Sequence, residues 1–151
     1  MEEQKFECLK LENQICFPLY ACSKEIIKRY KPFLDALDLT YTQYITMMVL
    51  WEKIEMNVKE LGKYLFLDSG TLTPVLKKLE SKGYISRTRM KTDERNVILR
   101  ITNSGLALRE QAVQIPAKMS RCIKMEPQEA MQLYSLLHKV MSSLSESEEN
   151  A

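Results

Sequence analysis

Cysteine is the residue type with the most varied chemistry in this chain, because a thiolate can be oxidised, cross-linked or bound to a metal. Four cysteines stand at positions 8, 16, 22 and 122 of the 151 residues. Zinc sites usually contain two cysteines separated by about two to four residues, and these positions do not fit that spacing. We therefore expect no metal and no bound cofactor. Each cysteine is then either an ordinary buried thiol or part of a redox switch.

Clustered cations are the second chemical feature, because lysine and arginine neutralise phosphate groups. The net charge is only +2, so the overall composition does not indicate a nucleic-acid partner. From Thr71 to Arg100, however, eight lysines and arginines stand against three acidic residues. From Glu126 to Asn150 the balance reverses, with five glutamates against one lysine. Such segregation is expected when one surface of a protein faces phosphates and another does not.

The bulk composition is that of a soluble globular protein, with 45% hydrophobic and 28% charged residues. No stretch approaches the roughly 18 apolar residues that a membrane span needs. The first residues, MEEQKFECLKLENQ, are acidic and lack the basic and then apolar order of a signal peptide. We expect a single cytoplasmic domain over residues 1–151, with a real core and no membrane partner.

An amphipathic helix is predicted over residues 9–32, because apolar side chains recur there at helical spacing. Pro18 interrupts this pattern, since a proline inside a helix removes a backbone donor and costs about 3 kcal/mol. Either the helix kinks at Pro18 or its regular part begins near that residue. Pro32 is expected to mark the end of the helix.

Two further helices are predicted from capping patterns. Thr40 and Gln43 form a capping box, and the helix that they open is expected to reach about Glu52. The side chains expected to be buried on this helix are Tyr44, Ile45, Met48 and Trp51. Asn57 is predicted to open a short second helix whose inward residues are Val58, Leu61 and Leu65.

A third helix and two strands follow. Asp68 and Ser69 are expected to cap the helix and Gly83 to end it, with an inward stripe of Leu72, Val75, Leu76 and Leu79. The segments 84–89 and 96–101 are predicted strands joined by a charged tip. This order is typical of the winged helix-turn-helix, which lays one helix in the DNA major groove and a basic loop beside it. The expected fold class is mainly α with a small β wing (α+β), with this core at residues 40–101.

The amphipathic helices at the two ends exceed what a winged helix needs for its own core. A helix beginning at Thr102 has a seam of Leu108, Ala112, Ile115, Met119 and Cys122. Pro116 is expected to kink that helix, and Pro127 to open a last helix with a wide apolar stripe. We expect the helices at 9–32 and 103–145 to form a homodimer that reads two half-sites of a pseudo-palindromic operator. The alternative is that all the helices pack within one chain.

The DNA-binding residues are predicted from two needs, short polar side chains where a helix enters the groove and cations where it passes phosphates. The polar set at the start of the third helix is Asp68, Ser69, Thr71 and Thr73. The cations farther along that helix are Lys77 and Lys78. Asp68 has an alternative role as a helix cap alone, because its charge repels phosphate. The wing adds Arg87, Arg89, Lys91 and Arg95, with Asp93 placed to orient the Arg95 guanidinium.

Six segments of the sequence resemble the MarR family of bacterial transcriptional regulators. LDSGTLTP (67–74) and DER (93–95) indicate the family, together with VKELG (58–62) and LKKLE (76–80). LENQICF (11–17) and LTYTQY (39–44) indicate its organic-hydroperoxide-resistance repressor branch. The resemblance implies a dimeric repressor that binds double-stranded operator DNA, responds to organic hydroperoxides and is not an enzyme.

The same resemblance implies roles for individual residues. Members of this branch use one cysteine near the start as the peroxide sensor, and here that position is Cys16. A thiol reacts as its thiolate, which hydrogen-bond donors or a helix N-terminus stabilise. By resemblance, the hydroxyls of Tyr30 and Tyr41 of the partner subunit donate to Cys16, with Tyr20 nearby. Some relatives carry a second cysteine after the wing that forms an intersubunit disulfide, and Cys122 is at a comparable separation from Cys16.

Three alternatives remain open at this point. Cys122 is either the resolving cysteine or an inert packing residue on its seam. A MarR-type regulator can also be released from DNA by a small aromatic ligand, bound between the dimer helices and the DNA-binding lobes. A thiol peroxidase using Cys16 is the alternative from another class, and sustained peroxide turnover with a thiol reductant would identify it.

Overall fold

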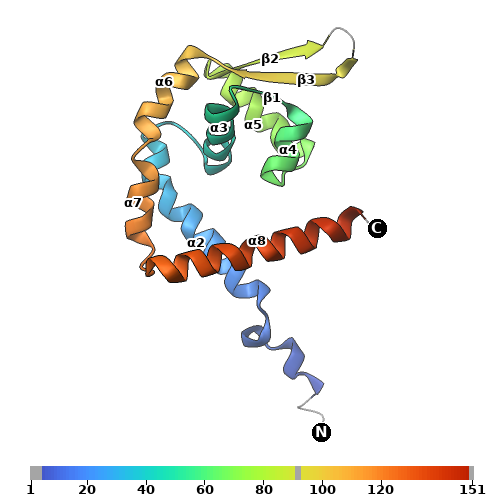
Figure 1. Ribbon diagram of the computed structural model, residues 1–151, viewed down its shortest axis with the longest axis vertical. Helices are drawn as coiled ribbons and strands as arrows, with labels where there is room; N and C mark the ends of the chain where they lie inside the picture. The colour runs from blue at the N-terminus through green and yellow to red at the C-terminus, as the bar shows by residue number, and fades with distance from the viewer. Residues whose placement is uncertain (1–4, 91–92, 150–151) are drawn as a thin grey trace. The chain divides into compact units, whose positions relative to one another are not determined.

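The computed structural model describes residues 5–90 and 93–149, and for residues 90, 93–95 and 146–149 it describes the backbone only. Two compact units are distinguished, Met1–Pro116 and Ala117–Ala151. The first contains a long helix, three shorter helices, a small sheet and a further helix (Figure 1). One long helix, α8 at Pro127–Glu149, makes up most of the second unit. The fold is mainly α with a small β wing, as the sequence predicts.

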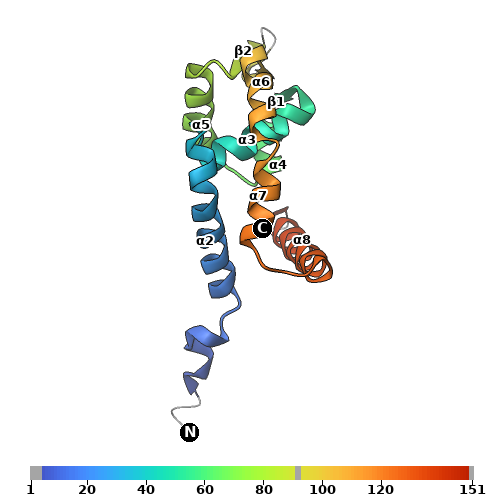
Figure 2. The same cartoon turned by 90° about the vertical axis from the view of Figure 1, so that its left-hand side faces the viewer.

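Helix α2 spans Cys16–Asp35 and follows two short 3₁₀ turns, η1 at Glu7–Leu9 and η2 at Leu11–Asn13 (Figure 2). Pro18 is its third residue, where a helix has no intrahelical donor to lose. The regular helix therefore begins near Pro18, which was one of the two expectations. The expectation that Pro32 ends the helix is wrong, because α2 continues for three more residues and buries Leu34, which is 2% exposed.

Helix α3 spans Tyr41–Lys53 and begins with the predicted capping box. The backbone N–H of Gln43 donates to Thr40 Oγ1 at 3.3 Å, and that of Thr40 donates to Gln43 Oε1 at 3.1 Å. Tyr44 is buried as expected, together with Met47 and Leu50. The expectation for Met48 is wrong, since it is 44% exposed. Met47 and Leu50 each stand one position before a residue that was expected to be buried, Met48 and Trp51.

The helix-turn-helix consists of α4 at Val58–Leu65 and α5 at Ser69–Ser81, whose expected caps are both present. Asn57 caps α4 by accepting from the Lys59 N–H at 2.7 Å, and Asp68 caps α5. The buried side chains of the pair are Leu61, Leu72, Leu76 and Leu79. After α5, Gly83 has a φ of +74°, a conformation that glycine adopts without strain. The chain can therefore turn directly into the wing.

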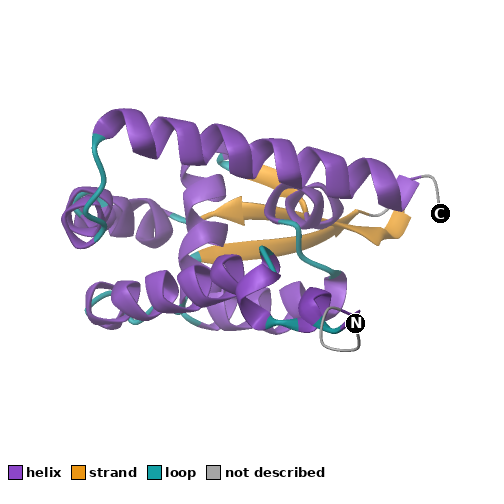
Figure 3. Cartoon of the chain, turned by 90° about the horizontal axis from the view of Figure 1, so that it is seen from below, coloured by secondary structure: helices purple, strands orange, loops and turns teal. Residues whose placement is uncertain are grey.

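The wing is a three-stranded antiparallel sheet in the order β1-β3-β2, drawn in orange in Figure 3. Strands β2 (Ile85–Met90) and β3 (Asp93–Ile101) correspond to the two predicted strands. Strand β1 (Glu55–Asn57) was not predicted, and it pairs with residues 98–100 of β3. It places α4 directly beside the sheet, because α4 begins at the next residue.

The chain after the wing forms three helices. Helix α6 (Asn103–Ala112) begins at its Thr102 cap, and α7 spans Ile115–Cys122. Pro116 was expected to kink one helix, but the chain ends α6 and starts α7 with Pro116 in its first turn, where proline is tolerated. Leu108, Ala112, Ile115 and Met119 are buried, as the seam predicts. Cys122 is exposed and not buried on the seam, because α7 ends there.

Helix α8 spans Pro127–Glu149, so it begins where predicted and extends four residues beyond the expected end at 145. Its large apolar side chains are exposed in the single chain, namely Met131, Leu133, Tyr134, Leu136, Val140 and Leu144. No helix in the described part of the chain combines the length and hydrophobicity required to cross a membrane.

Candidate DNA interface and thiol sensor

The start of α5 is a surface of short polar side chains held in place by its own cap. The Asp68 carboxylate accepts from the backbone N–H and from the hydroxyl of Thr71, both at 2.9 Å. The first of these bonds is the main reason that the pKa of Asp68 is lowered from its usual value of 3.8. The Thr73 hydroxyl donates to the Ser69 carbonyl oxygen at 2.6 Å. All four side chains are exposed, so the predicted polar set lies together at one helix end.

The predicted cations differ in whether they form an ion pair within the chain. Lys77 and Lys78 on α5 and Arg89 on β2 are exposed, and none has an acidic partner among the described residues. Arg87, by contrast, donates two hydrogen bonds to Glu80 Oε2, at 2.8 Å from Nε and 2.5 Å from Nη2. These bonds lower the pKa of Glu80. Arg87 therefore fastens β2 of the wing to α5.

The tip of the wing was also assigned to DNA binding. Lys91 lies outside the described residues, and the side chains of Asp93 and Arg95 do too. The backbone of Asp93 and Arg95 belongs to β3, and Asp93 is paired with Met90 of β2. This pair is the last one between β2 and β3, next to the residues that join the two strands.

A groove beside the start of α5 contains two lysines that the sequence analysis missed. It has a volume of about 430 Å³ and is bounded by α4, the first turns of α5 and Val97 of β3. Lys59 and Lys63 lie on its α4 side, exposed and four residues apart, so they share one helix face. Neither has an acidic partner among the described residues. The available signal was this spacing, on the first helix of a predicted helix-turn-helix.

Cys16 is the first residue of α2, and its side chain is exposed. The first four backbone N–H groups of a helix lack intrahelical acceptors and give this end a partial positive charge. Cys16 therefore lies at the end of α2 that has the partial positive charge. Cys8, Cys22 and Cys122 are also exposed, and all four cysteines are free. The expectation of buried thiols is wrong for the single chain.

Tyr30 and Tyr41 pack against each other, with ring centroids 5.0 Å apart, and Tyr44 extends the cluster at 5.9 Å from Tyr30. Burial raises the pKa of all three hydroxyls, and the proximity of Tyr41 adds to the effect at Tyr30. They therefore keep their protons at neutral pH and can act as donors. The hydroxyls of Tyr30 and Tyr41 have no hydrogen-bond partner among the described residues of their own chain.

Within one chain, the cysteine and the tyrosine pair are far apart. Cys16 and Tyr30 are both on α2, and fourteen positions separate them. At about 1.5 Å per residue, this amounts to roughly 21 Å along the helix axis. Only Tyr20, one turn from Cys16 and 63% exposed, is near it on the same helix. The predicted sensor residues thus form two separate halves in the single chain.

The family and the curated proteins that this chain matches are transcriptional regulators. Residues 28–111 match the family described as transcriptional regulator SarA/Rot. The organic hydroperoxide resistance transcriptional regulator of Bacillus subtilis is 46% identical over 142 residues, which cover 94% of this chain and 97% of that protein. The HTH-type transcriptional regulator SarZ of Staphylococcus aureus is 43% identical over 132 residues, covering 87% and 89%.

Two similar solved structures are those of AbfR, a protein of Staphylococcus epidermidis, in different states. Reduced AbfR bound to DNA has a TM-score of 0.79 at 31% identity, with 94% of this chain and 97% of that chain covered. Disulfide-formed AbfR has a TM-score of 0.64 at 32% identity, with 93% and 99% covered.

Proposed function

The chain belongs to the SarA/Rot and MarR-type transcriptional regulators, in the organic-hydroperoxide-resistance branch, and we propose that it is a dimeric repressor that leaves its operator DNA when organic hydroperoxide oxidises Cys16. The observation that carries this proposal is the position of Cys16. Its thiol is exposed and is the first residue of a 20-residue helix. The similarity to a regulator named for organic hydroperoxide resistance supports the choice of oxidant.

The DNA interface in this proposal is the start of α5 with its flanking cations. Ser69, Thr71 and Thr73 face the bases, with Asp68 holding Thr71 in place. Phosphates are bound from three sides, by Lys77 and Lys78 on α5, by the wing residues Arg89, Lys91 and Arg95, and by Lys59 and Lys63 on α4. Asp93 orients Arg95, and Arg87 acts indirectly by holding the wing against α5.

A homodimer is supported by apolar surface that one chain leaves uncovered. The exposed stripe of α8 and the exposed N-terminal side chains Leu9, Ile15 and Phe17 would cost free energy in water. We assign residues 9–32 and 103–145 to dimerisation, within one MarR-type domain that contains the winged core at 40–101. Two such cores would read two half-sites of a pseudo-palindromic operator.

The dimer also provides a partner for Cys16. Because Tyr30 lies roughly 21 Å along α2 from Cys16 of its own chain and Tyr41 packs against Tyr30, we assign both tyrosines to the cysteine of the other chain. Their protonated hydroxyls stabilise its thiolate by donating hydrogen bonds. Tyr20 contributes from the same helix as Cys16, at the distance of one turn.

The chemical step balances as follows. The Cys16 thiolate attacks the terminal oxygen of the hydroperoxide, the O–O bond breaks, and the alkoxide leaves and is protonated to an alcohol. Cys16 becomes a sulfenic acid. The Cys122 thiol of the other chain then attacks the Cys16 sulfur, a disulfide forms, and water leaves. The exposure of Cys122 on the last residue of α7 supports its access to this reaction.

A second candidate function is release by a small aromatic ligand. A pocket of about 270 Å³ lies at the corner between α2 and α3, lined by Ile27, Leu34, Leu39 and Tyr41, with Lys28 and the ion pair of Lys31 and Asp35 at its side. Apolar walls with a few polar groups at one side suit a small aromatic ligand. This candidate does not require Cys16.

The experiment uses an operator selected from random-sequence DNA by binding to the reduced protein. Fluorescence anisotropy of the complex is followed during titration with cumene hydroperoxide, hydrogen peroxide and salicylate, for wild type and Cys16→Ser. The proposal expects cumene hydroperoxide to release wild type at the lowest concentration and to leave Cys16→Ser bound. Release of both proteins by salicylate alone would support the second candidate. Repeated peroxide consumption with dithiothreitol would indicate a thiol peroxidase.

A further inference from the structure

We propose that Lys82 is the positioning residue that couples the oxidation state of the sensor to the DNA-reading helix α5, by bridging the last turn of α5 to the first turn of α3. The inference rests on the proposed function, because it assumes that Tyr41 is part of the sensor. It assigns a role to a lysine that neither contacts DNA in the proposed interface nor belongs to the sensor.

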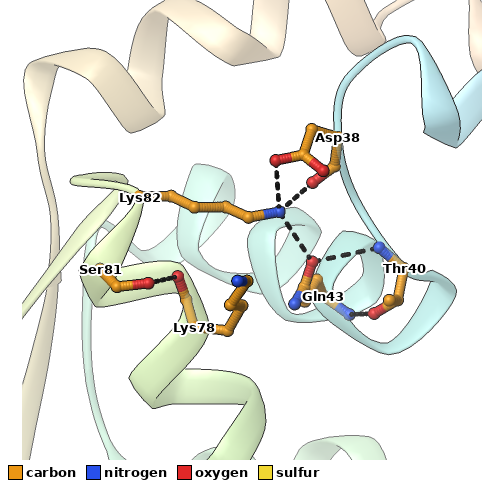
Figure 4. Close-up of polar contacts among 6 residues, drawn as sticks. All are labelled: Asp38, Thr40, Gln43, Lys78, Ser81 and Lys82. Carbon is orange, nitrogen blue, oxygen red and sulfur yellow. Dashed lines mark hydrogen bonds and ion pairs between the residues drawn. The ribbon is translucent and has the colours of Figure 1, made fainter.

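Lys82 is the C-cap residue of α5, and its side chain is only 13% exposed. Its ammonium group lies 3.0 Å from Asp38 Oδ2, donates to the backbone carbonyl oxygen of Asp38, and lies 3.5 Å from Gln43 Oε1 (Figure 4). Three oxygens from the α2–α3 region thus surround one cation from α5. The Lys82 ammonium group is therefore bound mainly by protein oxygens, whereas the exposed Lys78, one turn earlier, is solvated by water.

The acceptors of Lys82 are fixed by the backbone. Asp38 has a φ of +51°, in the left-handed region, within the turn that joins α2 to α3. The flanking residues Leu37 and Leu39 are buried, and both of their N–H groups donate to the Leu34 carbonyl oxygen at 3.0 Å. The turn is therefore tied to the end of α2. Lys82 contacts Asp38 through both its carboxylate and its backbone carbonyl oxygen.

The third acceptor connects Lys82 to the tyrosine pair. Gln43 Oε1 also accepts from the Thr40 N–H at 3.1 Å, as the reciprocal bond of the capping box. Thr40 precedes Tyr41, whose ring packs on Tyr30 at 5.0 Å. A short series of contacts therefore runs from the Tyr41 ring, through the first turn of α3, to the last turn of α5.

Two consequences follow for a change at the sensor. Loss of the thiolate removes the acceptor for the Tyr41 hydroxyl and allows the start of α3 to shift. Water cannot easily replace the oxygens around the Lys82 ammonium group, so leaving this charge without them would be costly. When these oxygens move, Lys82 therefore moves with them and carries the end of α5. The cation thereby converts a local change at α3 into a change in the orientation of α5.

The test compares operator affinity in two oxidation states. The ratio of the dissociation constant after cumene hydroperoxide to that of the reduced protein is measured for wild type and for Lys82→Met, which keeps the aliphatic chain. The inference expects this ratio to fall by about tenfold or more in Lys82→Met, within the usual range of allosteric coupling. Formation of the Cys16 sulfenic acid, followed by mass spectrometry, should be unchanged. A purely structural role would lower the melting temperature without changing the ratio.

Lys53→Met is the matched control, because Lys53 also forms an ion pair with an acidic residue, Glu52, but within α3. Its ratio should equal that of wild type. Should Lys82→Met fail to fold, Asp38→Asn serves in its place, since asparagine tolerates the left-handed conformation and Asp38 is 86% exposed. A smaller fall in the ratio is expected there. A wild-type ratio in the variant measured overturns the inference, whereas a wild type that stays bound after oxidation overturns the proposed function itself.

Discussion

Single residues in this chain are prepared for their roles by very local contacts. Burial raises the pKa of the Tyr30 and Tyr41 hydroxyls further above neutral pH, so each keeps a hydrogen to donate to an acceptor. Two hydrogen bonds from Thr71 hold the Asp68 carboxylate and lower its pKa. In both cases the neighbouring groups reinforce the protonation state that the side chain has at neutral pH.

Asp68 provides a pH test at this scale. Its pKa is lowered on folding, mainly by the bond from the Thr71 N–H, while the unfolded chain titrates near 3.8. The cap therefore contributes stability above pH 3.8, and this contribution is lost as the pH falls through the lower folded pKa. Asp68→Asn keeps a good helix cap but cannot titrate. The free energy of unfolding, measured in urea from about pH 5 to pH 2, should depend less steeply on pH in Asp68→Asn. An unchanged dependence would mean that the Asp68 cap is not coupled to folding.

Among the elements, those with local signals were predictable. The caps at Thr40, Asn57 and Asp68 are local, because the side chain bonds to a backbone group two or three residues away. Strand β1 was missed because three residues have no local preference strong enough to form a strand without β3. The end of α2 was misjudged because burial of Leu34 stabilises the helix beyond Pro32.

Part of the candidate site could likewise be predicted from local patterns in the sequence. The polar residues at the start of α5 could be predicted to lie together because the cap at Asp68 fixes where the helix begins. The pairing of Arg87 with Glu80 could not, since it depends on how β2 packs on α5. The spacing of Lys59 and Lys63 places them on one face of α4, but their position beside the start of α5 depends on how the two helices pack. Contacts between elements therefore account for what the sequence pattern did not show.

The proposed interface predicts the salt dependence of DNA binding. Lys63→Ala on α4 and Arg95→Ala on the wing should each weaken operator binding and lower the slope of log affinity against log salt by about one counterion. The double variant should lose about two, because the two elements contact separate phosphates. Lys28→Ala on α2 is the control and should keep the wild-type slope. Wild-type slopes in Lys63→Ala would remove α4 from the interface, and wild-type slopes in Arg95→Ala would remove the wing.

At the scale of the whole molecule, the proposed sensor requires two chains. The apolar stripe of α8 is exposed to water in the single chain. Cys16 of the same chain is also too far along α2 to contact Tyr30. A single sensor would therefore be built from Cys16 of one chain and Tyr30 and Tyr41 of the partner subunit. This arrangement makes oxidation sensitive to dimer geometry, which also sets the spacing of the two α5 helices.

Mixed dimers test this arrangement directly. A dimer of one Cys16→Ser chain and one Tyr41→Phe chain contains an intact sensor only if the two residues act across the interface. Its remaining Cys16 should then be oxidised by cumene hydroperoxide as fast as in wild type, whereas the Tyr41→Phe homodimer should react several-fold more slowly. Slow oxidation in the mixed dimer would place both residues in one chain. Stopped-flow fluorescence on tagged, purified mixed dimers gives the rates.

Cys122 provides a second test at this scale. Oxidised wild type should migrate as a covalent dimer on non-reducing gels and return to the monomer position with dithiothreitol. Cys122→Ser should still release DNA at first, through the sulfenic acid, but should overoxidise more readily. Cys8→Ser and Cys22→Ser should behave as wild type. A covalent dimer that persists in Cys122→Ser would show that another cysteine resolves Cys16.

The central claim is that oxidation of Cys16 is what releases the operator. Its most direct test titrates the DNA complex of the reduced protein with cumene hydroperoxide while intact-mass spectrometry follows the oxidation of Cys16. The fraction of released DNA should rise in proportion to the oxidised fraction of Cys16 and be complete near one equivalent per chain, while Cys16→Ser stays bound at the same oxidant concentrations. Release of Cys16→Ser at the wild-type concentration, or full oxidation of Cys16 with the DNA still bound, would contradict the account.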